Sequence, residues 1–220
     1  MMIHISNVSK SYARDTPALI DVNLEFVKGE FAFLTGPSGA GKSTLLKLLF
    51  GAEKPDEGQI LIDGRNISRL RSAHIPLLRR KIGVVFQDFK LLKNQSVFEN
   101  VAMAVEVLGE SRARVQHKTW RVLKSVGLAH KMHTKAVLLS GGEQQRIAIA
   151  RAIVNEPDIL LGDEPTGNLD PDLTMEIMKF LQQVNARGTT VVIATHDPEL
   201  LSRFNKRQVV LDRGRVVADN

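Results

Sequence analysis

The densest group of residues suited to chemistry lies in GPSGAGKSTLL, residues 36 to 46. Glycine backbone can wrap phosphate groups with its N–H groups, and a helix that starts directly afterwards adds the positive end of its dipole. The first eight residues fit the pattern G-x-x-x-x-G-K-[ST], which predicts a nucleoside triphosphate site with the lysine on the β and γ phosphates and the hydroxyl on Mg²⁺. The candidate phosphate-binding residues are Gly36, Pro37, Ser38, Gly39, Ala40, Gly41, Lys42, Ser43 and Thr44. A merely flexible glycine turn is the alternative, and the apolar run before it and the helical pattern after it argue against that.

Two adjacent carboxylates follow a second apolar run, in ILLGDEP. Asp163, at the end of this predicted buried strand, is a candidate ligand for the Mg²⁺ that Ser43 also binds. Glu164 follows directly and is a candidate to orient or deprotonate an attacking water. An acidic turn after a strand is the alternative for this pair alone, and the upstream phosphate loop makes the catalytic interpretation stronger.

A second loop suited to anions is LSGGEQQR, residues 139 to 146. Two glycines stand at the start of a predicted helix, whose N-terminal N–H groups can bind an anion. The candidate nucleotide-binding residues are Ser140, Gly141, Gly142 and Glu143. The first phosphate loop does not need this second one, so the segment requires an explanation of its own.

The elements that must position these residues follow from hydrophobic periodicity. Residues 3–8 and 20–27 alternate apolar and polar side chains and predict antiparallel strands. The apolar runs at 31–34, in DILLGDEP and in TTVVIATHD predict buried strands, with a helix between the last two. Strand, helix and strand at this spacing predict a right-handed parallel crossover. Ligands bind at the carboxyl ends of such strands, where Lys42, Asp163, Glu164 and His196 fall.

The middle of the chain has apolar residues at helical spacing. Three helices are expected, in SVFENVAMAVEVLG, ARVQHKTWRVLKSVGL and GGEQQRIAIARAIV. The predicted organisation is one domain over 1–220, with a core at 1–87 and 156–220 and an inserted helical subdomain at about 88–155. We expect an α/β fold in which the nucleotide-binding core carries this insert.

Composition excludes some classes of protein. The 220 residues contain no cysteine, which excludes disulfides and fits a reducing compartment. The amino-terminal residues do not read as a signal peptide, and no apolar run approaches the roughly 18–20 residues that span a bilayer. The net charge of +6 could indicate binding to nucleic acid or to an anionic membrane face. Direct nucleic-acid binding is disfavoured because the basic residues are scattered, with one dense cluster at 78–82, and because aromatic residues are few (5%).

With these motifs in their order, the whole chain resembles an ATP-binding subunit of the ABC type. This resemblance implies a P-loop NTPase fold with a RecA-like core, an antiparallel β subdomain and an inserted helical subdomain. It also implies ATP and Mg²⁺ as ligands, ATP hydrolysis, and a head-to-tail homodimer in the ATP-bound state. In that dimer the segment at 139–146 of one subunit closes on the γ-phosphate bound by the other.

Four further residues receive roles from the resemblance. Tyr12 resembles the aromatic that stacks on adenine, although a tyrosine at a strand edge is the alternative. Gln87 resembles the glutamine that senses Mg²⁺ and the γ-phosphate. Asp170 lies in a segment that resembles the loop that crosses to the partner subunit. His196 resembles the histidine that contacts the γ-phosphate. Gly162 stands where alanine is common in the family, and we expect no loss of chemistry from it.

Long stretches, including PLLRRKIGVVFQDFKLL and FLTGPSGAGKSTLLKLL, resemble the branch of the family that acts in bacterial cell division. That resemblance implies an FtsX-like integral membrane partner, control of murein hydrolases outside, and a peripheral position on the cytoplasmic face of the bacterial plasma membrane. ATPases of lipoprotein-release, macrolide-type or small-molecule transporters are the alternative. Soluble ABC ATPases acting on DNA or ribosomes, and a nucleotide-binding regulator without turnover, fit the motifs less well.

The resemblance also implies that the partner binds the groove between core and insert. Phe89, Leu91 and Leu92 are candidate exposed contacts for a partner helix. The alternative is that these side chains complete the core of the insert.

Overall fold

The computed structural model describes residues 1–13, 16–167 and 169–220. Four strands form an antiparallel sheet in the order β2-β1-β4-β5: β1 (Ile3–Ala13), β2 (Thr16–Phe26), β4 (Glu57–Ile62) and β5 (Arg65–Asn66). The first two strands are longer than the periodicity predicts. Register shifts divide their pairing, and Asn7 and Asp21 have positive φ, so the alternation of apolar and polar residues is interrupted within continuous strands.

A second sheet of six strands has the order β10-β9-β3-β8-β7-β6. Its members are β3 (Phe31–Thr35), β6 (Ile82–Val85), β7 (Ile159–Asp163), β8 (Thr190–Ala194), β9 (Arg207–Asp212) and β10 (Arg215–Asp219). The β7 and β8 strands are adjacent and parallel, as the crossover pattern requires. Every residue of β3 and of β8 is buried, because both faces of the sheet are covered.

Helices cover the sheet and form the insert. The core helices are α1 (Lys42–Leu49), α2 (Ile75–Arg79), α6 (Pro171–Ala186) and α7 (Pro198–Phe204). The helices of the insert are α3 (Val97–Glu106), α4 (Arg112–Ser125) and α5 (Gly141–Ile153). Short 3₁₀ turns occupy η1 (Ser72–His74), η2 (Ala129–Lys131) and η3 (Ala136–Leu138). Capping boxes at Ser96 and Ser140 fix where α3 and α5 begin.

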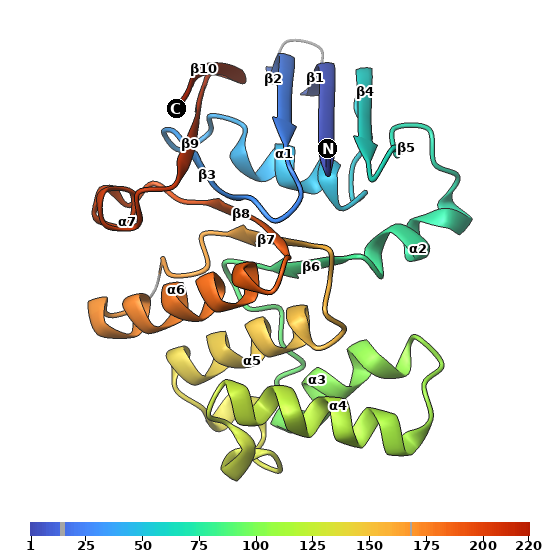
Figure 1. Ribbon diagram of the computed structural model, residues 1–220, viewed down its shortest axis with the longest axis vertical. Helices are drawn as coiled ribbons and strands as arrows, with labels where there is room; N and C mark the ends of the chain where they lie inside the picture. Colours follow the sequence, from blue (N-terminus) through green and yellow to red (C-terminus); the bar gives the residue numbers. More distant parts are fainter. Residues whose placement is uncertain (14–15, 168) are drawn as a thin grey trace.

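Two hydrophobic clusters lie on opposite faces of the six-stranded sheet. Phe33 and Ile193 point into the cluster that holds the insert and α6. Leu34 and Ala194, the next residues along the same strands, point into the cluster that holds α1 and the antiparallel sheet. Figure 1 shows this layering, with α5 and α6 on one side of the sheet and α1 on the other. The alternation along each strand therefore joins core and insert through a single central layer.

Candidate nucleotide site

The carboxyl ends of three parallel strands converge on one cavity of about 590 Å³. The phosphate loop (residues 36–43) follows β3, Asp163 ends β7 with Glu164 directly after it, and His196 lies just beyond β8. The cavity is lined by Ala18, Pro37, Ser38, Gly39, Ala40, Gly41, Lys42, Ser43, Thr44, Gln87, Asp163, Glu164 and His196. Segments separated by more than a hundred residues thus supply one site.

The phosphate loop needs glycine at two points of close approach. Gly36 has a φ of 134°, and a Cβ there would lie 2.0 Å from the Leu211 carbonyl oxygen. Gly41 has a φ of 107°, and its Cβ would lie 2.5 Å from the Ala18 carbonyl oxygen. Both the backbone conformation and the neighbouring backbone therefore exclude a side chain, which leaves the loop N–H groups open to a ligand.

Lys42 is buried beneath this loop. Its ammonium donates hydrogen bonds to the carbonyl oxygens of Gly36 at 2.6 Å and Pro37 at 2.9 Å. These bonds hold a positive charge against the inner side of the loop. The predicted phosphate contact of Lys42 remains a proposal, and a charge already held at the cavity wall suits it.

Ser43 and Asp163 meet at the floor of the cavity, where the Ser43 hydroxyl donates to Asp163 Oδ1 at 3.0 Å. Burial raises the pKa of Asp163, the neighbouring charge of Glu164 adds to the rise, and the hydrogen bond from Ser43 opposes it. A partly desolvated carboxylate beside a hydroxyl is an oxygen donor set that fits Mg²⁺. Within the described ranges no three His, Cys, Asp or Glu side chains form a metal-binding group.

Glu164 lies at the junction of three strand ends. Its carboxylate is 2.7 Å from His196 Nδ1 and accepts a longer hydrogen bond of 3.4 Å from the Gln87 amide. Its backbone has a φ of 47°, and its N–H donates to the Ala194 carbonyl at 2.9 Å. A left-handed backbone held by the neighbouring strand fixes where the carboxylate points. Such a positioned carboxylate can accept a proton from water.

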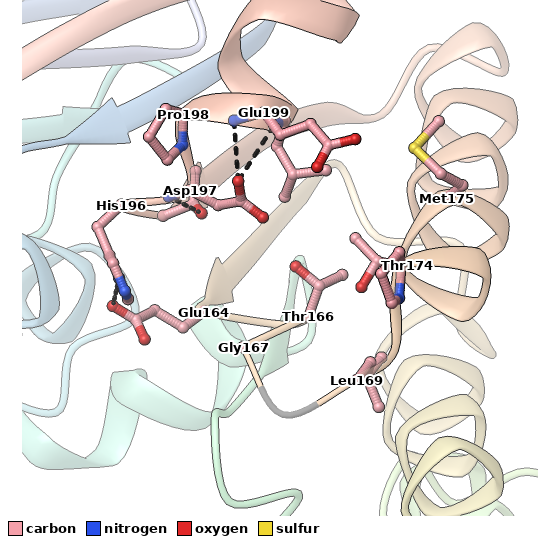
Figure 2. A pocket seen from close by; sticks show the side chains of 13 residues that line it. Glu164, Thr166, Gly167, Leu169, Thr174, Met175, His196, Asp197, Pro198 and Glu199 are labelled. Atoms are coloured by element: carbon pink, nitrogen blue, oxygen red, sulfur yellow. Dashed lines mark hydrogen bonds and ion pairs between the residues drawn. The ribbon is translucent and has the colours of Figure 1, made fainter.

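Figure 2 shows the Glu164 and His196 side chains pointing toward each other at the edge of a second cavity, of about 350 Å³. Thr166, Thr195 and Asp197 line this second cavity together with residues of α6. The pair therefore separates two spaces, since both residues also line the phosphate cavity.

Several predicted residues lie outside the phosphate cavity as the described residues define it. Tyr12 is 54% exposed on β1, with the Lys10 ammonium 5.9 Å from the centre of its ring. Asp170 caps α6 by accepting a hydrogen bond from the Leu173 N–H at 3.0 Å. Their roles in stacking and in crossing to a second subunit stay predictions.

The signature segment (residues 139–146) begins α5 on the helical insert. Ser140 and Glu143 form a capping box, in which each side chain accepts from the other's backbone N–H. The Glu143 carboxylate also contacts Lys131, and this contact is the first cause of its lowered pKa. Gly141 has open space around its Cβ position. The start of the helix is thus exposed while its cap is satisfied internally.

Two positioning residues were absent from the sequence-based candidates. Gln145, buried on α5, donates to the Pro165 carbonyl directly after Glu164. Arg151, two turns along the same helix, donates to the carbonyls of Phe89 and Lys90, each at 2.7 Å. Gln145 lies within the LSGGEQQR motif, and this position could have identified it as a candidate. The contacts of Arg151 depend on a loop conformation that hydrophobic periodicity does not predict.

Fold and cavity together define a P-loop ATPase with a helical insert. A family model described as "ABC transporter" matches residues 19–167, and one described as "AAA domain, putative AbiEii toxin, Type IV TA system" matches residues 133–202. The chain is 49% identical to the "Cell division ATP-binding protein FtsE" of Bacillus subtilis (strain 168), over 99% of this chain and 96% of that protein. The proteins of the same description from Mycobacterium tuberculosis and Escherichia coli K12 are 48% and 46% identical, over 100% and 98% of this chain and 96% and 97% of theirs.

Solved structures agree with this assignment. "Dimeric Structure of MJ0796, a Bacterial ABC Transporter Cassette" matches with a TM-score of 0.92 and 38% identity, over 100% of this chain and 98% of the other. A post-hydrolysis state of the same cassette, bound to ADP and Pi, matches with a TM-score of 0.91 and 37% identity, over 100% and 98%. The chain belongs to the ABC transporter ATPase family, within the FtsE group of cell division ATP-binding proteins. The predicted fold class is confirmed, and the chain is an ATPase that forms ADP and phosphate.

Proposed function

We propose that this chain is the ATP-hydrolysing subunit of a bacterial division complex, and that two copies close on two Mg²⁺-bound ATP molecules. Closure is relayed by an FtsX-like integral membrane partner to peptidoglycan hydrolases on the other side of the membrane. The similarity to cell division ATP-binding proteins of several bacteria supports the division role. In this proposal the chain is peripheral, on the cytoplasmic face. Within the described ranges no helix is both long and apolar enough to cross a bilayer.

The separation of the two anion-binding loops is the observation that carries this proposal. Ser140 to Glu143 lie on the insert, and none of the four lines the phosphate cavity among the described residues. An exposed helix start with open space at Gly141 suits a phosphate brought by a second copy. The dimeric form described for a relative of 38% identity supports the pairing of two copies.

Within each site we assign the following roles, which the geometry supports. Ser43, Asp163 and Gln87 hold Mg²⁺, which when bound neutralises phosphate charge. Glu164 accepts the proton of the attacking water, and His196 keeps that carboxylate oriented and contacts the γ-phosphate. Lys42 and the N–H groups of the phosphate loop hold the β and γ phosphates.

Closure needs a difference in contacts between ATP and ADP. In the closed state the γ-phosphate contacts Lys42 of one copy and the signature segment of the other, so ATP binds the closed state more tightly than the open one. Only such a difference in affinity shifts the equilibrium between open and closed states. After hydrolysis this difference disappears and the dimer reopens. The phosphate loop therefore acts as one half of a clamp.

A groove of about 480 Å³ between core and insert is the proposed partner site. Pro76 and Arg79 of α2 line one side, and Val107 and Leu108 after α3 line the other. Phe50 and Phe86 contact each other edge-on inside it. An apolar floor with polar edges suits an amphipathic segment of a membrane protein.

The candidate contacts Phe89 and Leu91 do not fit the prediction of an exposed socket. Both are partly buried and pack against the core cluster of the insert, and Arg151 holds the Phe89 carbonyl. Leu92 is exposed (46%). We therefore propose the neighbouring groove as the partner surface. Of the three candidate contacts, Leu92 is the exposed one.

The test is capture of the membrane partner by a tagged Glu164→Gln variant from membranes solubilised with ATP and Mg²⁺, followed by mass spectrometry. We expect a small integral membrane protein with a large extracytoplasmic domain. Adding Val107→Asp, at a groove position 70% exposed, should abolish the capture, whereas Val217→Asp, 58% exposed on β10, should leave it intact.

Other captures would reassign the complex. A permease with many spanning helices, or a lipoprotein-release partner, would contradict the division role and place the chain in a transporter. Equal capture by the Val107→Asp variant would contradict the groove as the partner site.

A further inference from the structure

A run of basic residues without any acid lies between residues 64 and 87. It holds six Lys or Arg residues and no Asp or Glu, although the whole chain has 30 basic and 24 acidic residues. Lys81 forms an ion pair with Asp63, and Arg79 donates to the carbonyls of Phe50 and Gly51. The remaining four are exposed: Arg65, Arg69, Arg71 and Arg80.

The arginine rim, defined as Arg69, Arg71 and Arg80, has no carboxylate partner among the residues that the structure describes. Some arginines elsewhere pair with a carboxylate, as Arg121 does with Glu156 and Arg146 with Glu176, but what sets this run apart is that it contains no acidic residue. Three unpaired guanidinium groups on one short segment repel one another in the free chain. An anionic surface would relieve that repulsion.

One member of the arginine rim, Arg80, lines the groove proposed for the membrane partner, and Arg69 and Arg71 precede it on the same segment of the chain. Pro76 and Val107 line the same groove. Figure 1 shows α2 and the loop before it at an outer edge of the molecule. The same helix exposes Leu77 (51%), so an aliphatic side chain stands among the charges.

We propose that the arginine rim binds the phosphate headgroups of anionic phospholipids on the membrane that holds the partner. The orientation of the chain on the membrane rests on the proposed function, because a membrane protein bound in the groove would place the residues beside the groove near the bilayer. Guanidinium groups bind phosphate in a bidentate manner, and an exposed aliphatic residue beside them suits the headgroup boundary. Single-stranded nucleic acid fits less well, because Phe86 is the only aromatic residue in the run.

The experiment is flotation of the purified full chain with vesicles of phosphatidylcholine and phosphatidylglycerol, compared with vesicles of phosphatidylcholine alone. We expect salt-sensitive binding to the anionic vesicles only. Each basic residue near such a surface is worth about fivefold in affinity, so Arg69→Gln with Arg71→Gln should weaken binding roughly 25-fold. ATP turnover should stay unchanged, because neither residue lines the nucleotide cavity.

The matched control is Arg112→Gln with Lys124→Gln, which removes the same charge from exposed positions on α4. We expect this control to bind anionic vesicles nearly as well as the unaltered chain. An equal loss in the control, equal binding to neutral vesicles, or no binding to either would overturn the proposal. The vesicles contain no protein, so a failure here is separate from a failure to capture the membrane partner.

Discussion

Glu164 shows how a single residue obtains its function from neighbours far away in sequence. The β8 strand fixes its backbone through the Ala194 carbonyl, His196 holds one carboxylate oxygen, and Gln87 approaches the other. The carboxylate therefore has one orientation at the cavity before any ligand arrives. Preorganisation of this kind is what a general base requires.

Replacing Glu164 by Gln should lower the rate of ATP hydrolysis about 10²–10⁴-fold, because an amide cannot accept the proton from water. ATP binding should persist, since the phosphate loop is unchanged. Steady-state phosphate release and equilibrium ATP binding measure the two effects. Glu199→Gln, at a neighbouring carboxylate that lines the second cavity, is the control and should keep normal turnover. Normal turnover in the Glu164 variant would contradict the assignment of the base.

Gly36→Ala and Gly39→Ala form a matched pair within the phosphate loop. Both positions have positive φ, but only the Gly36 Cβ meets backbone, at 2.0 Å from the Leu211 oxygen. Gly39→Ala should cost about 1 kcal/mol of stability from backbone strain alone. Gly36→Ala should destabilise the chain further and abolish ATP binding. Denaturant unfolding and nucleotide binding test the pair, and equal effects would show that strain, not the clash, governs the loop.

At the scale of elements, the sequence predicts the strands that carry the site better than the tertiary contacts that hold them in place. Apolar runs that end in polar residues predict where β3, β7 and β8 meet the ligand, because parallel strands share a carboxyl edge. The link from α5 to the loop after Gln87 is different. It joins Arg151 to residues 61 and 62 positions earlier in the chain and needs positive φ at Phe89 and Lys90. Neither condition leaves a periodic pattern, so tertiary packing alone decides it.

Arg151→Ala should release this loop. Burial lowers the pKa of Arg151, yet its guanidinium satisfies the two carbonyls of residues in left-handed backbone. Leaving both without a partner should cost about 2–4 kcal/mol in the free energy of unfolding. Denaturant titration measures the loss. Arg203→Ala, at an exposed pair with Glu199, should cost less than about 0.5 kcal/mol. A similarly small loss for Arg151→Ala would show that the link is dispensable.

The β9–β10 hairpin supplies a prediction about pH. Two hydrogen bonds of 2.6 Å from Arg207 hold the pKa of Asp219 below its usual range. An acid with a depressed pKa stabilises the fold above its unfolded value, near 4, and this contribution disappears as pH falls through the folded pKa. Asp219→Asn should therefore lower stability by about 1 kcal/mol or less at pH 7 and by progressively less below pH 4. A loss that does not depend on pH would contradict the ionic origin.

At the scale of the whole molecule, the chain presents two incomplete halves of a site. The phosphate cavity lies on the core, whereas the start of α5 lies on the insert. The insert packs on one face of the six-stranded sheet, and among the described residues the start of α5 does not line the cavity. In the proposed head-to-tail pair, the start of α5 of each copy would complete the phosphate cavity of the other. The groove between core and insert lies where a change in their relation would reach a membrane partner.

The most direct test of this clamp is the mass of the Glu164→Gln variant with ATP and Mg²⁺, measured by sedimentation, with and without Gly141→Asp. Open space at Gly141 lets the aspartate fold in place, where its charge would repel the γ-phosphate of a second copy. The account predicts an ATP-dependent dimer for Glu164→Gln, and an ATP-bound monomer once Gly141→Asp is added. A monomer in the first case, or an undiminished dimer in the second, would contradict the claim that the signature segment closes on the other copy's ATP.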